Sequence, residues 1–178
     1  MPLDPREAAQ SLADLSELPA DLAEALVPIF SALQEIGRVR DALEDTAPQQ
    51  TGKLVKFGHG GVLIDTEAAP DLTDASVQDW LLAEEGPRSL YDPARVLAFA
   101  IEEADLGRFA GLDVSWSADS DLGPLLVTGP GDDAPGDIGM QAFHLDTGGN
   151  DTWTHEAGAN SRSYPVSVHI DLSGNDTY

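Results

Sequence analysis

Apolar residues recur at steps of three and four along the first part of the chain. The longest such stripe consists of Leu22, Leu26, Ile29, Phe30, Leu33, Ile36, Val39 and Leu43. This spacing places its members on one face and predicts an α-helix of roughly 25 residues. Ser16 is a candidate N-cap, and Pro19 fits the first turn, where a missing N–H is tolerated. Pro28 lies inside the stripe and predicts a kink or a break.

Shorter apolar periodicities predict further helices before residue 110. They cover residues 7–15, a segment that Asp74 caps and that runs through Leu82, and a segment that Asp92-Pro93 opens and Gly107 ends. Between them, residues 53–66 hold two short apolar runs separated by glycines, which predicts a strand, a turn and a strand. Isolated helices of this length are marginal in water, so we expect them to pack on another element.

From about Leu112 the helical period disappears. Gly, Asp, Asn, Thr and Ser become frequent, and β-branched residues alternate with polar ones. We therefore expect an α+β chain in two parts. Residues 1–110 would form an α-rich N-terminal capping region, and residues 111–178 would form a β region.

The β region contains an internal repeat of eleven residues. Phe143–Trp153 aligns without gaps on Val168–Tyr178, 25 residues later, and both copies keep His, Asp, Gly, Asn, Asp and Thr at equivalent positions. Each copy ends on an aromatic residue. A weaker copy, Leu125–Pro135, precedes the first one by 18 residues. Two good copies and a weaker one indicate a repeat architecture.

Each repeat unit has the pattern of a strand followed by a tight turn. Val168 and Ile170 alternate with His169 and Asp171, which predicts a strand with its apolar side chains inward and its His and Asp side chains outward. The Gly-Asx-Asp sequence that follows suits a turn, because Gly and Asn tolerate a positive φ. Such units bury an apolar face only by stacking. The repeat therefore predicts the first rungs of a right-handed parallel β-helix, or solenoid.

Stacking in register would bring like charges together. Asp146 would lie over Asp171, and Asp133, Asp151 and Asp176 would form a second column, with neighbouring strands about 4.8 Å apart. Unit charges at that spacing repel by roughly 1 kcal/mol in water and by more in a less polar setting. Either water screens these carboxylates, with Asp and Asn forming side-chain ladders, or a cation lies between them. The candidate ligands for Ca²⁺ are Asp146, Asp151, Asp171, Asp176, Asn150 and Asn175.

The end of each unit resembles a known calcium-binding repeat. Gly149–Trp153 and Gly174–Tyr178 are similar to the latter half of the nonapeptide of repeats-in-toxin β-rolls. The period differs, at 25 rather than 9 or 18, and the leading glycine pair is absent. The whole unit more closely resembles uncharacterised bacterial β-solenoid proteins with Gly-(Asn/Asp)-Asp-x-Tyr repeats, over about residues 123–178. This resemblance implies a solenoid and, through the β-rolls, calcium as a cofactor.

The net charge of the chain limits the classes of partner that it can bind. With 32 acidic and 9 basic residues, the net charge is −23, which argues against nucleic acid and anionic membranes and favours a divalent cation. The chain contains no cysteine, which excludes disulfides and thiolate sites. No apolar run is long enough to span a membrane, and the N-terminus as given lacks the pattern of a secretory signal.

We therefore expect a structural or binding β-solenoid protein of bacterial surface or exported type, assisted by calcium. Because no capping element follows the last repeat, we expect the chain to be the N-terminal portion of a longer protein, or to self-associate through the open solenoid end. Two alternatives remain open. One is an enzyme that acts on polysaccharide or carries a catalytic domain in a further C-terminal part, and the other is a protein-interaction module that uses the N-terminal helices.

Two further residue pairs have a structural and a functional interpretation. His144 and His169 occupy equivalent outward positions and would form a transition-metal site, although the repeat alone explains their alignment. Trp153 and Tyr178 would form either a packing ladder or a ligand platform, and packing is the simpler interpretation. The glycines at 58, 60 and 61 suit a turn, because the chain has no Gly-x-Ser-x-Gly sequence to supply a nucleophile.

Overall fold

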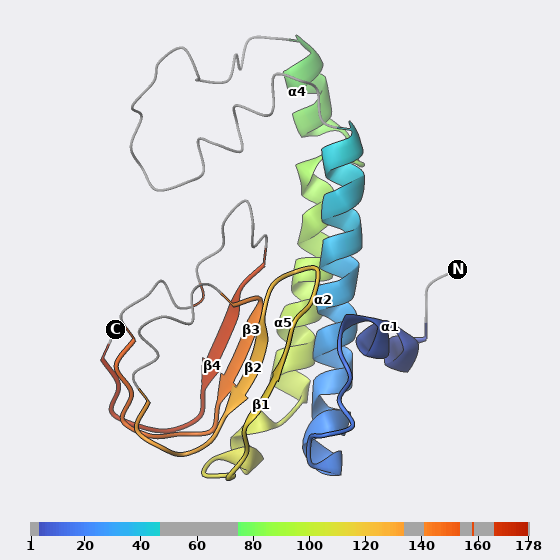
Figure 1. Ribbon diagram of the computed structural model, residues 1–178. Coiled ribbons are helices and arrows are strands. Elements are labelled where there is room, and N and C mark those ends of the chain that lie inside the picture. The colour runs from blue at the N-terminus through green and yellow to red at the C-terminus, as the bar shows by residue number, and fades with distance from the viewer. Residues whose placement is uncertain (1–3, 47–74, 134–140, 154–157, 159–165, 178) are drawn as a thin grey trace.

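A computed structural model describes residues 4–46, 75–133, 141–153, 158 and 166–177. Helices precede strands, as Figure 1 shows, so the chain has an α+β fold. The α-helices are α1 (Pro5–Leu12), α2 (Ala20–Thr46), α4 (Ala75–Leu82) and α5 (Tyr91–Glu103), with 3₁₀ turns η3 (Pro87–Leu90) and η4 (Leu106–Phe109). The strands are β1 (Trp116–Ala118), β2 (Leu125–Thr128), β3 (Phe143–Asp146) and β4 (Val168–Asp171).

The predicted apolar stripe forms the buried side of α2, which confirms that prediction. Leu22, Leu26, Ile29, Phe30 and Leu33 are fully buried. The helix runs for 27 residues through Pro28, so of the kink or break predicted there, the break does not occur. Packing of the buried residues on both sides of the proline outweighs the loss of one backbone hydrogen bond.

The ends of the helices differ in detail from the sequence predictions. Helix α2 begins directly after Pro19, whose carbonyl accepts a hydrogen bond from Ala23 at 2.9 Å, so Ser16 does not cap it. Helix α5 ends before Gly107, and Asp105 adopts the left-handed conformation there. The predicted cap at Asp74 and the predicted hairpin over 53–66 lie outside the described residues. None of the described helices is both long and apolar enough to cross a membrane.

The strands form one open mixed sheet in the order β1-β2-β3-β4. Strands β2, β3 and β4 are parallel, with Phe143 opposite both Leu125 and Val168, and Asp146 opposite both Thr128 and Asp171. This register is the one that the repeat alignment predicts. Strand β1, which the sequence analysis did not predict, runs antiparallel and covers the outer edge of β2.

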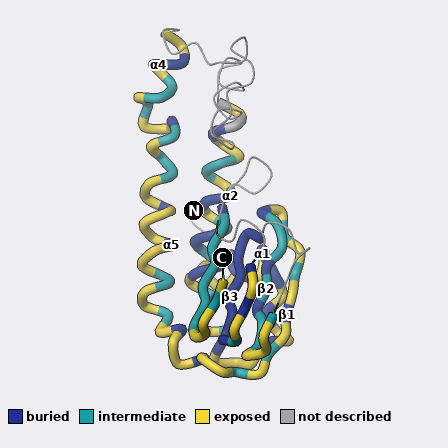
Figure 2. Tube along the Cα trace, turned by 90° about the vertical axis from the view of Figure 1, so that its left-hand side faces the viewer, coloured by how far each residue is buried: buried dark blue, intermediate teal, exposed yellow. Residues whose placement is uncertain are grey.

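The apolar face of the sheet packs against α2. The ring of Phe30 meets the edge of Phe143 with a centroid distance of 5.1 Å, and it lies 6.1 Å from Trp116. The buried apolar residues of the helices and strands form one core. The helices therefore cover one face of the sheet. Figure 2 shows α5 beside α2, with most of the residues of α5 exposed or half-buried.

Candidate metal centre

The segments that follow β2, β3 and β4 turn away together and run alongside one another (Figure 1). They contain Gly131-Asp132-Asp133, Gly149-Asn150-Asp151 and Gly174-Asn175-Asp176, which we call the Gly-Asx-Asp stack. Backbone hydrogen bonds of 2.9 Å join them, from the N–H of Thr152 to the carbonyl of Asp133 and from the N–H of Thr177 to the carbonyl of Asp151. The repeat is thus stacked at two places, in the sheet and in the Gly-Asx-Asp stack.

The middle residue of each Gly-Asx-Asp unit binds the following unit. The Oδ1 of Asp132 accepts a hydrogen bond from the backbone N–H of Asn150 at 2.7 Å. One repeat later, the Oδ1 of Asn150 accepts one from the backbone N–H of Asn175 at 3.1 Å. Asp and Asn are interchangeable at this position because both offer an acceptor oxygen on a short side chain.

The last residue of the second and third units binds the preceding unit. The Oδ1 of Asp151 accepts a hydrogen bond from the backbone N–H of Asp133 at 2.5 Å. The Oδ1 of Asp176 accepts one from the backbone N–H of Asp151 at 2.8 Å. The Asn150-Asp151 pair therefore connects to the unit before it and to the unit after it, which is the ladder considered from the sequence as an alternative to a metal site.

Glycine at the first position allows the units to approach closely. A Cβ on Gly149 would lie 2.3 Å from the carbonyl oxygen of Gly131, and one on Gly174 would lie 2.0 Å from that of Gly149. Both glycines have a positive φ, of 144° and 157°. A side chain at either position would collide with rigid backbone, so the glycine is a requirement of the stacking.

Three carboxylates meet between the sheet and the stack. Asp146 is the last residue of β3, while Asp133 and Asp151 belong to successive Gly-Asx-Asp units. Each of the three offers a carboxylate oxygen within 4.8 Å of the other two. Asp146 and Asp151 are buried, and Asp133 is half-buried. We call this group the aspartate triad.

Each buried member of the triad has one bonded and one open carboxylate oxygen. The Oδ1 of Asp146 accepts a hydrogen bond from the backbone N–H of Gly148 at 2.8 Å, and the Oδ1 of Asp151 is bound in the ladder. The Oδ2 atoms of Asp146 and Asp151 are buried without a hydrogen-bond partner among the described residues. Buried acceptors that remain unpaired are rare in native proteins and call for a partner.

Burial opposes ionisation of two members of the triad, Asp146 and Asp133, and the neighbouring carboxylates add to this effect. Burial raises the pKa of Asp146 to about 6, although interactions with the Gly148 N–H and the Thr128 hydroxyl partly offset this rise. Burial also raises the pKa of Asp133, and the charges of Asp151 and Asp132 add to that effect. The ion pairs Arg6–Glu24, Arg38–Glu35, Arg40–Asp41 and Arg95–Asp92 lie in the helical part of the chain. Arg162 is the only Lys or Arg residue beyond Gly111 in the sequence.

The triad has the geometry and the chemistry of a hard-cation site. Ca²⁺ binds oxygen ligands at 2.3–2.6 Å, so oxygens within 4.8 Å of one another can share one ion. The ligands are carboxylates only, which favours Ca²⁺, Mg²⁺ or Mn²⁺ over softer metals. A cation at this position would pair with the open oxygens and would lower the raised pKa of Asp146 and of Asp133.

The structure places the sequence-predicted ligands in three settings. Asp146 and Asp151 belong to the triad. Asp171 lies beside Asp146 in the sheet, where burial and a hydrogen bond to Asp176 raise its pKa. Asp176 has a lowered pKa because it accepts the backbone hydrogen bond from Asp151.

The remaining predicted ligands, Asn150 and Asn175, are exposed in the stack. The sequence analysis placed Asp133 in the same column as Asp151 but did not include it among the ligands. The signal that would have identified it is the weaker first repeat, in which Asp133 aligns with Asp151.

The prediction that His144 points outward was wrong. The segment that follows β3 and ends in Trp153 covers the polar face of the sheet, so that His144 is only 1% exposed. Its ring meets Trp153 edge-on at 4.9 Å and His169 at 5.1 Å, and Trp153 lies 4.5 Å from His169. The Nε2 of His144 lies 2.8 Å from the Oγ1 of Thr128. Trp153 therefore packs on the histidines, whereas the predicted ladder with Tyr178 lies outside the described residues.

Comparisons with known proteins identify no relative. No protein-family model matches the chain, and searches of curated proteins and of solved structures give no match.

Proposed function

We propose that the chain is a structural or binding module of the β-solenoid type whose stacked repeats hold Ca²⁺ at the aspartate triad. The solenoid part of this proposal rests on the two parallel stacks, which repeat the same contacts at intervals of 18 and 25 residues. The resemblance to bacterial Gly-(Asn/Asp)-Asp-x-Tyr repeats and, more distantly, to repeats-in-toxin β-rolls supports it.

The open Oδ2 atoms of Asp146 and Asp151 are the observation that carries the calcium assignment. The ionised form of Asp146 is unfavourable without a compensating charge, because burial of its carboxylate raises its pKa. A divalent cation supplies the missing charge and occupies the open acceptors. Three protein ligands leave room for waters, as is common for Ca²⁺, and suit a weak site with a Kd on the order of 0.1–1 mM.

A weak site of this kind suits a protein outside the cell. Extracellular modules bind Ca²⁺ in the range of about 10⁻⁴ to 10⁻³ M, where the ion is abundant. The absence of cysteine and the strongly acidic composition are compatible with export. We therefore keep a surface or exported location as part of the proposal.

Calcium titration with matched variants tests the proposal. Calorimetry and thermal unfolding of the chain, with Ca²⁺ and with a chelator, should detect binding and a stabilisation of about 1.4 kcal/mol at tenfold Kd. Asp146→Asn should lose both effects, because it removes a ligand charge and keeps the acceptor for the Gly148 N–H. Asp132→Asn is the control, because the next repeat carries Asn at the equivalent exposed position, and its affinity should stay within about threefold.

Two results would contradict the calcium assignment. One is the absence of heat and of any thermal shift up to about 10 mM Ca²⁺, a concentration well above the expected Kd. The other is a thermal shift that Asp146→Asn retains in full, which would place the ion elsewhere.

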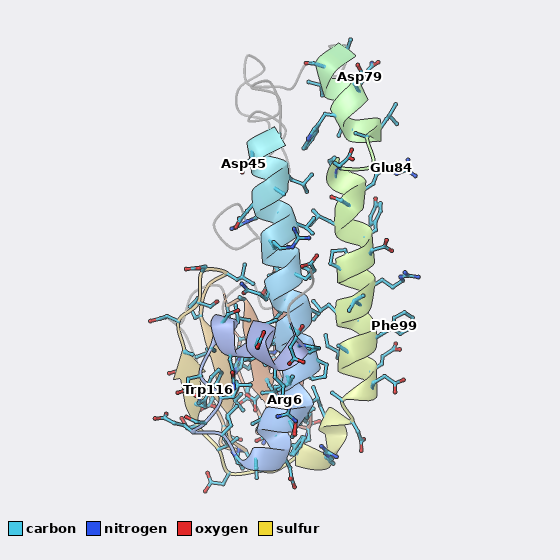
Figure 3. The ribbon with its side chains drawn as sticks, turned by 90° about the vertical axis from the view of Figure 1, so that its right-hand side faces the viewer. Arg6, Asp45, Asp79, Glu84, Phe99 and Trp116 are labelled. Carbon is cyan, nitrogen blue, oxygen red and sulfur yellow. The ribbon has the colours of Figure 1, made fainter. Side chains whose placement is uncertain are left out.

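A second candidate function is a protein-interaction module in the helical part. Tyr91, Val96 and Phe99 on α5 are more than half exposed, and Phe99 lies on the side of α5 away from α2 (Figure 3). A groove of about 890 Å³ also lies between α1, α2 and α5, lined by Pro28 and Ala100 among others. Exposed apolar residues that gather on one helix favour contact with another protein.

Sedimentation analysis tests this second function for association with a second copy. Concentration-dependent association that Phe99→Ser abolishes would support it. A chain that stays monomeric at all concentrations would contradict it.

A further inference from the structure

The groove between α1, α2 and α5, which we call the helical groove, has a floor of mostly short side chains. Four of its lining residues recur at steps of three and four along one face of α2, namely Pro28, Ser31, Ala32 and Glu35. Helices α1 and α5 each pack against α2 beside this face (Figure 3). The volume of the groove is about 890 Å³. Its short floor would let a further helix approach α2 to the spacing of about 8–10 Å that packed helices adopt.

The walls of the helical groove are also small and apolar. Ala8 lines it from α1, while Val96 and Ala100, one turn apart, line it from α5. A second hollow of about 290 Å³ shares Pro28 and Ala100 with the groove, so the depression continues between α2 and α5. A continuous apolar depression between packed helices suits an amphipathic helix, which binds through apolar residues at steps of three and four.

Pro28 occupies an unusual position for its residue type. It lies exposed inside α2, where proline is the least favourable residue and where burial of its ring does not offset that cost. Because proline has no N–H, the carbonyl of Glu24 lacks the donor that position 28 would otherwise supply. Glu24 and Pro28 both line the second hollow. Departures from local preference are expected at functional surfaces, and this one adds a backbone acceptor to an apolar depression.

The far end of the second hollow is acidic. Glu103 and Asp105 line it, and Glu102 precedes them in the sequence. All three lie at or just beyond the C-terminus of α5, where the helix dipole is negative and favours basic residues instead. None of the three has an ion-pair partner among the described residues. Arg108 also lines the hollow, but its guanidinium lies over the ring of Phe109 at 4.7 Å. This end therefore favours contact with a cationic group.

We propose that the helical groove binds an amphipathic helix of another protein, with an apolar face against α2 and lysine or arginine side chains at the end that meets the C-terminus of α5. The apolar side chains would fill the space over Ser31 and Ala32. The basic side chains would pair with Glu103 and Asp105, at the end where the dipole of α5 strengthens the negative potential.

A second copy of this chain lacks the chemistry that the groove requires. Each copy carries a net charge of −23, and none of its four described α-helices has a net positive charge. Like charges would therefore meet at the acidic end of the groove. The groove is also distinct from the side of α5 that carries Phe99, which faces away from α2 (Figure 3). The proposal thus concerns a different surface and a different partner from self-association through Phe99.

Binding of a designed peptide to the full chain tests this proposal. The probe is a fluorescent, acetylated and amidated peptide of about 18 residues, long enough to form a helix, and it contains leucine, alanine and lysine. Its leucines follow steps of three and four, and its lysines gather at one end. Fluorescence anisotropy is measured in a chelator, which makes the result independent of the calcium proposal. We expect a Kd on the order of 10 μM at about 0.15 M salt, weakened about fivefold at about 0.5 M salt.

A control peptide separates recognition of the groove from attraction between opposite charges. It has the same composition and the same lysine positions, but its leucines are distributed around the helix. Because it presents no apolar face, it should bind at least about tenfold more weakly than the probe.

Variants of the chain locate the binding site. Ser31→Phe and Ala100→Phe fill the groove from α2 and from α5, and each should weaken binding about tenfold. Ala98→Phe is the matched control, because Ala98 is exposed on α5 outside the groove, and binding should stay within about twofold. Circular dichroism checks that each variant is folded, and two groove variants on different helices keep the test valid if one of them is not.

Phe99→Ser separates this proposal from self-association. It removes the exposed aromatic side chain on the other side of α5, so binding of the peptide should stay within about twofold even where self-association is lost. A chain that remains monomeric and binds the peptide would support the groove and would contradict self-association.

Four results would overturn the proposal. The first is the absence of binding up to about 1 mM peptide. The second is equal affinity for the control peptide, which would leave charge alone as the cause. The third is unaltered affinity in both groove variants, which would place the peptide elsewhere. The fourth is a dimer that both groove variants dissociate, because a second copy would then occupy the groove.

Discussion

The Oδ1 of Asp151 accepts a hydrogen bond at 2.5 Å from the backbone N–H of Asp133, which lies 18 residues earlier. The Oδ2 of the same carboxylate is buried without a hydrogen-bond partner among the described residues. A ladder and a cation site therefore need not compete for this residue, because the ladder uses one oxygen and leaves the other available. The sequence analysis treated the two as alternatives, and the geometry makes them compatible.

The stability of the cation-free chain should depend on the ionisation of Asp146. Its pKa is about 6 in the folded chain and near 3.8 when unfolded, so folding favours the neutral carboxyl. This contribution is complete below about pH 4 and is lost as the pH rises through about 6. Comparing urea unfolding of the chain and of Asp146→Asn in a chelator isolates it. The variant should gain on the order of 2 kcal/mol relative to the unaltered chain between pH 4 and 7.

Calcium should reverse that pH effect. A bound cation favours the ionised carboxylate, so the stability lost above pH 6 should return at saturating Ca²⁺. An equal pH dependence in the chain and in Asp146→Asn would show that this carboxyl does not govern it.

Substitution of Gly149 should disrupt the stack. Gly149→Ala places a Cβ 2.3 Å from the carbonyl oxygen of Gly131 and forces a positive φ on alanine, so we expect a loss of at least about 2 kcal/mol in the free energy of unfolding. Gly131→Ala is the control, because a Cβ there meets no atom within 4 Å. It should change stability by about 0.5 kcal/mol or less. Similar losses in both variants would argue against steric stacking at Gly149.

The middle position of the ladder should require an acceptor oxygen rather than an amide. Asn150→Ala removes the acceptor for the N–H of Asn175 and should cost about 1 kcal/mol of stability in urea unfolding. Asn150→Asp keeps the acceptor, as Asp132 does one repeat earlier, and should remain within about 0.5 kcal/mol. If alanine is tolerated as well as aspartate, the ladder adds nothing measurable to stability.

Phe30 should be the main link between the helices and the sheet. It is fully buried and contacts Phe143 and Trp116, so Phe30→Ala should lose about 3–5 kcal/mol and alter Trp116 fluorescence. Phe99→Ala truncates the same residue type at a position that is 55% exposed and should cost about 0.5 kcal/mol or less. Equal effects of the two substitutions would contradict the packing of α2 on the sheet.

The repeat allowed the sequence to predict much of the β region. Aligned positions such as His144 and His169 lie opposite each other in the sheet, and Gly149 and Gly174 occupy equivalent places in the stack. The strand register follows from the alignment because stacked units that differ only in their connections must make the same contacts. The apolar stripe of α2 was equally visible, because a helix buries a continuous face.

The alternation of apolar and polar residues did not predict which face of the sheet is covered by the segment that follows β3. The pattern separates Phe143 and Leu145 from His144 and Asp146, but both sets are buried. Helix α2, which lies far earlier in the sequence, covers the first set, and the segment that follows the strand and ends in Trp153 covers the second. Alternation therefore identified the two faces without identifying their partners, and burial of the polar face is what produces the triad.

In the Gly-Asx-Asp stack, successive units make the same contact although different numbers of residues separate them in the sequence. Eighteen residues connect Asp132 to Asn150 and twenty-five connect Asn150 to Asn175, yet the same hydrogen bond closes both steps. The connections can thus lengthen by several residues while the geometry of the steps is conserved. Evolution or protein engineering can place new sequence in these connections, and each insertion would be displayed at a regular interval along a scaffold that it does not alter.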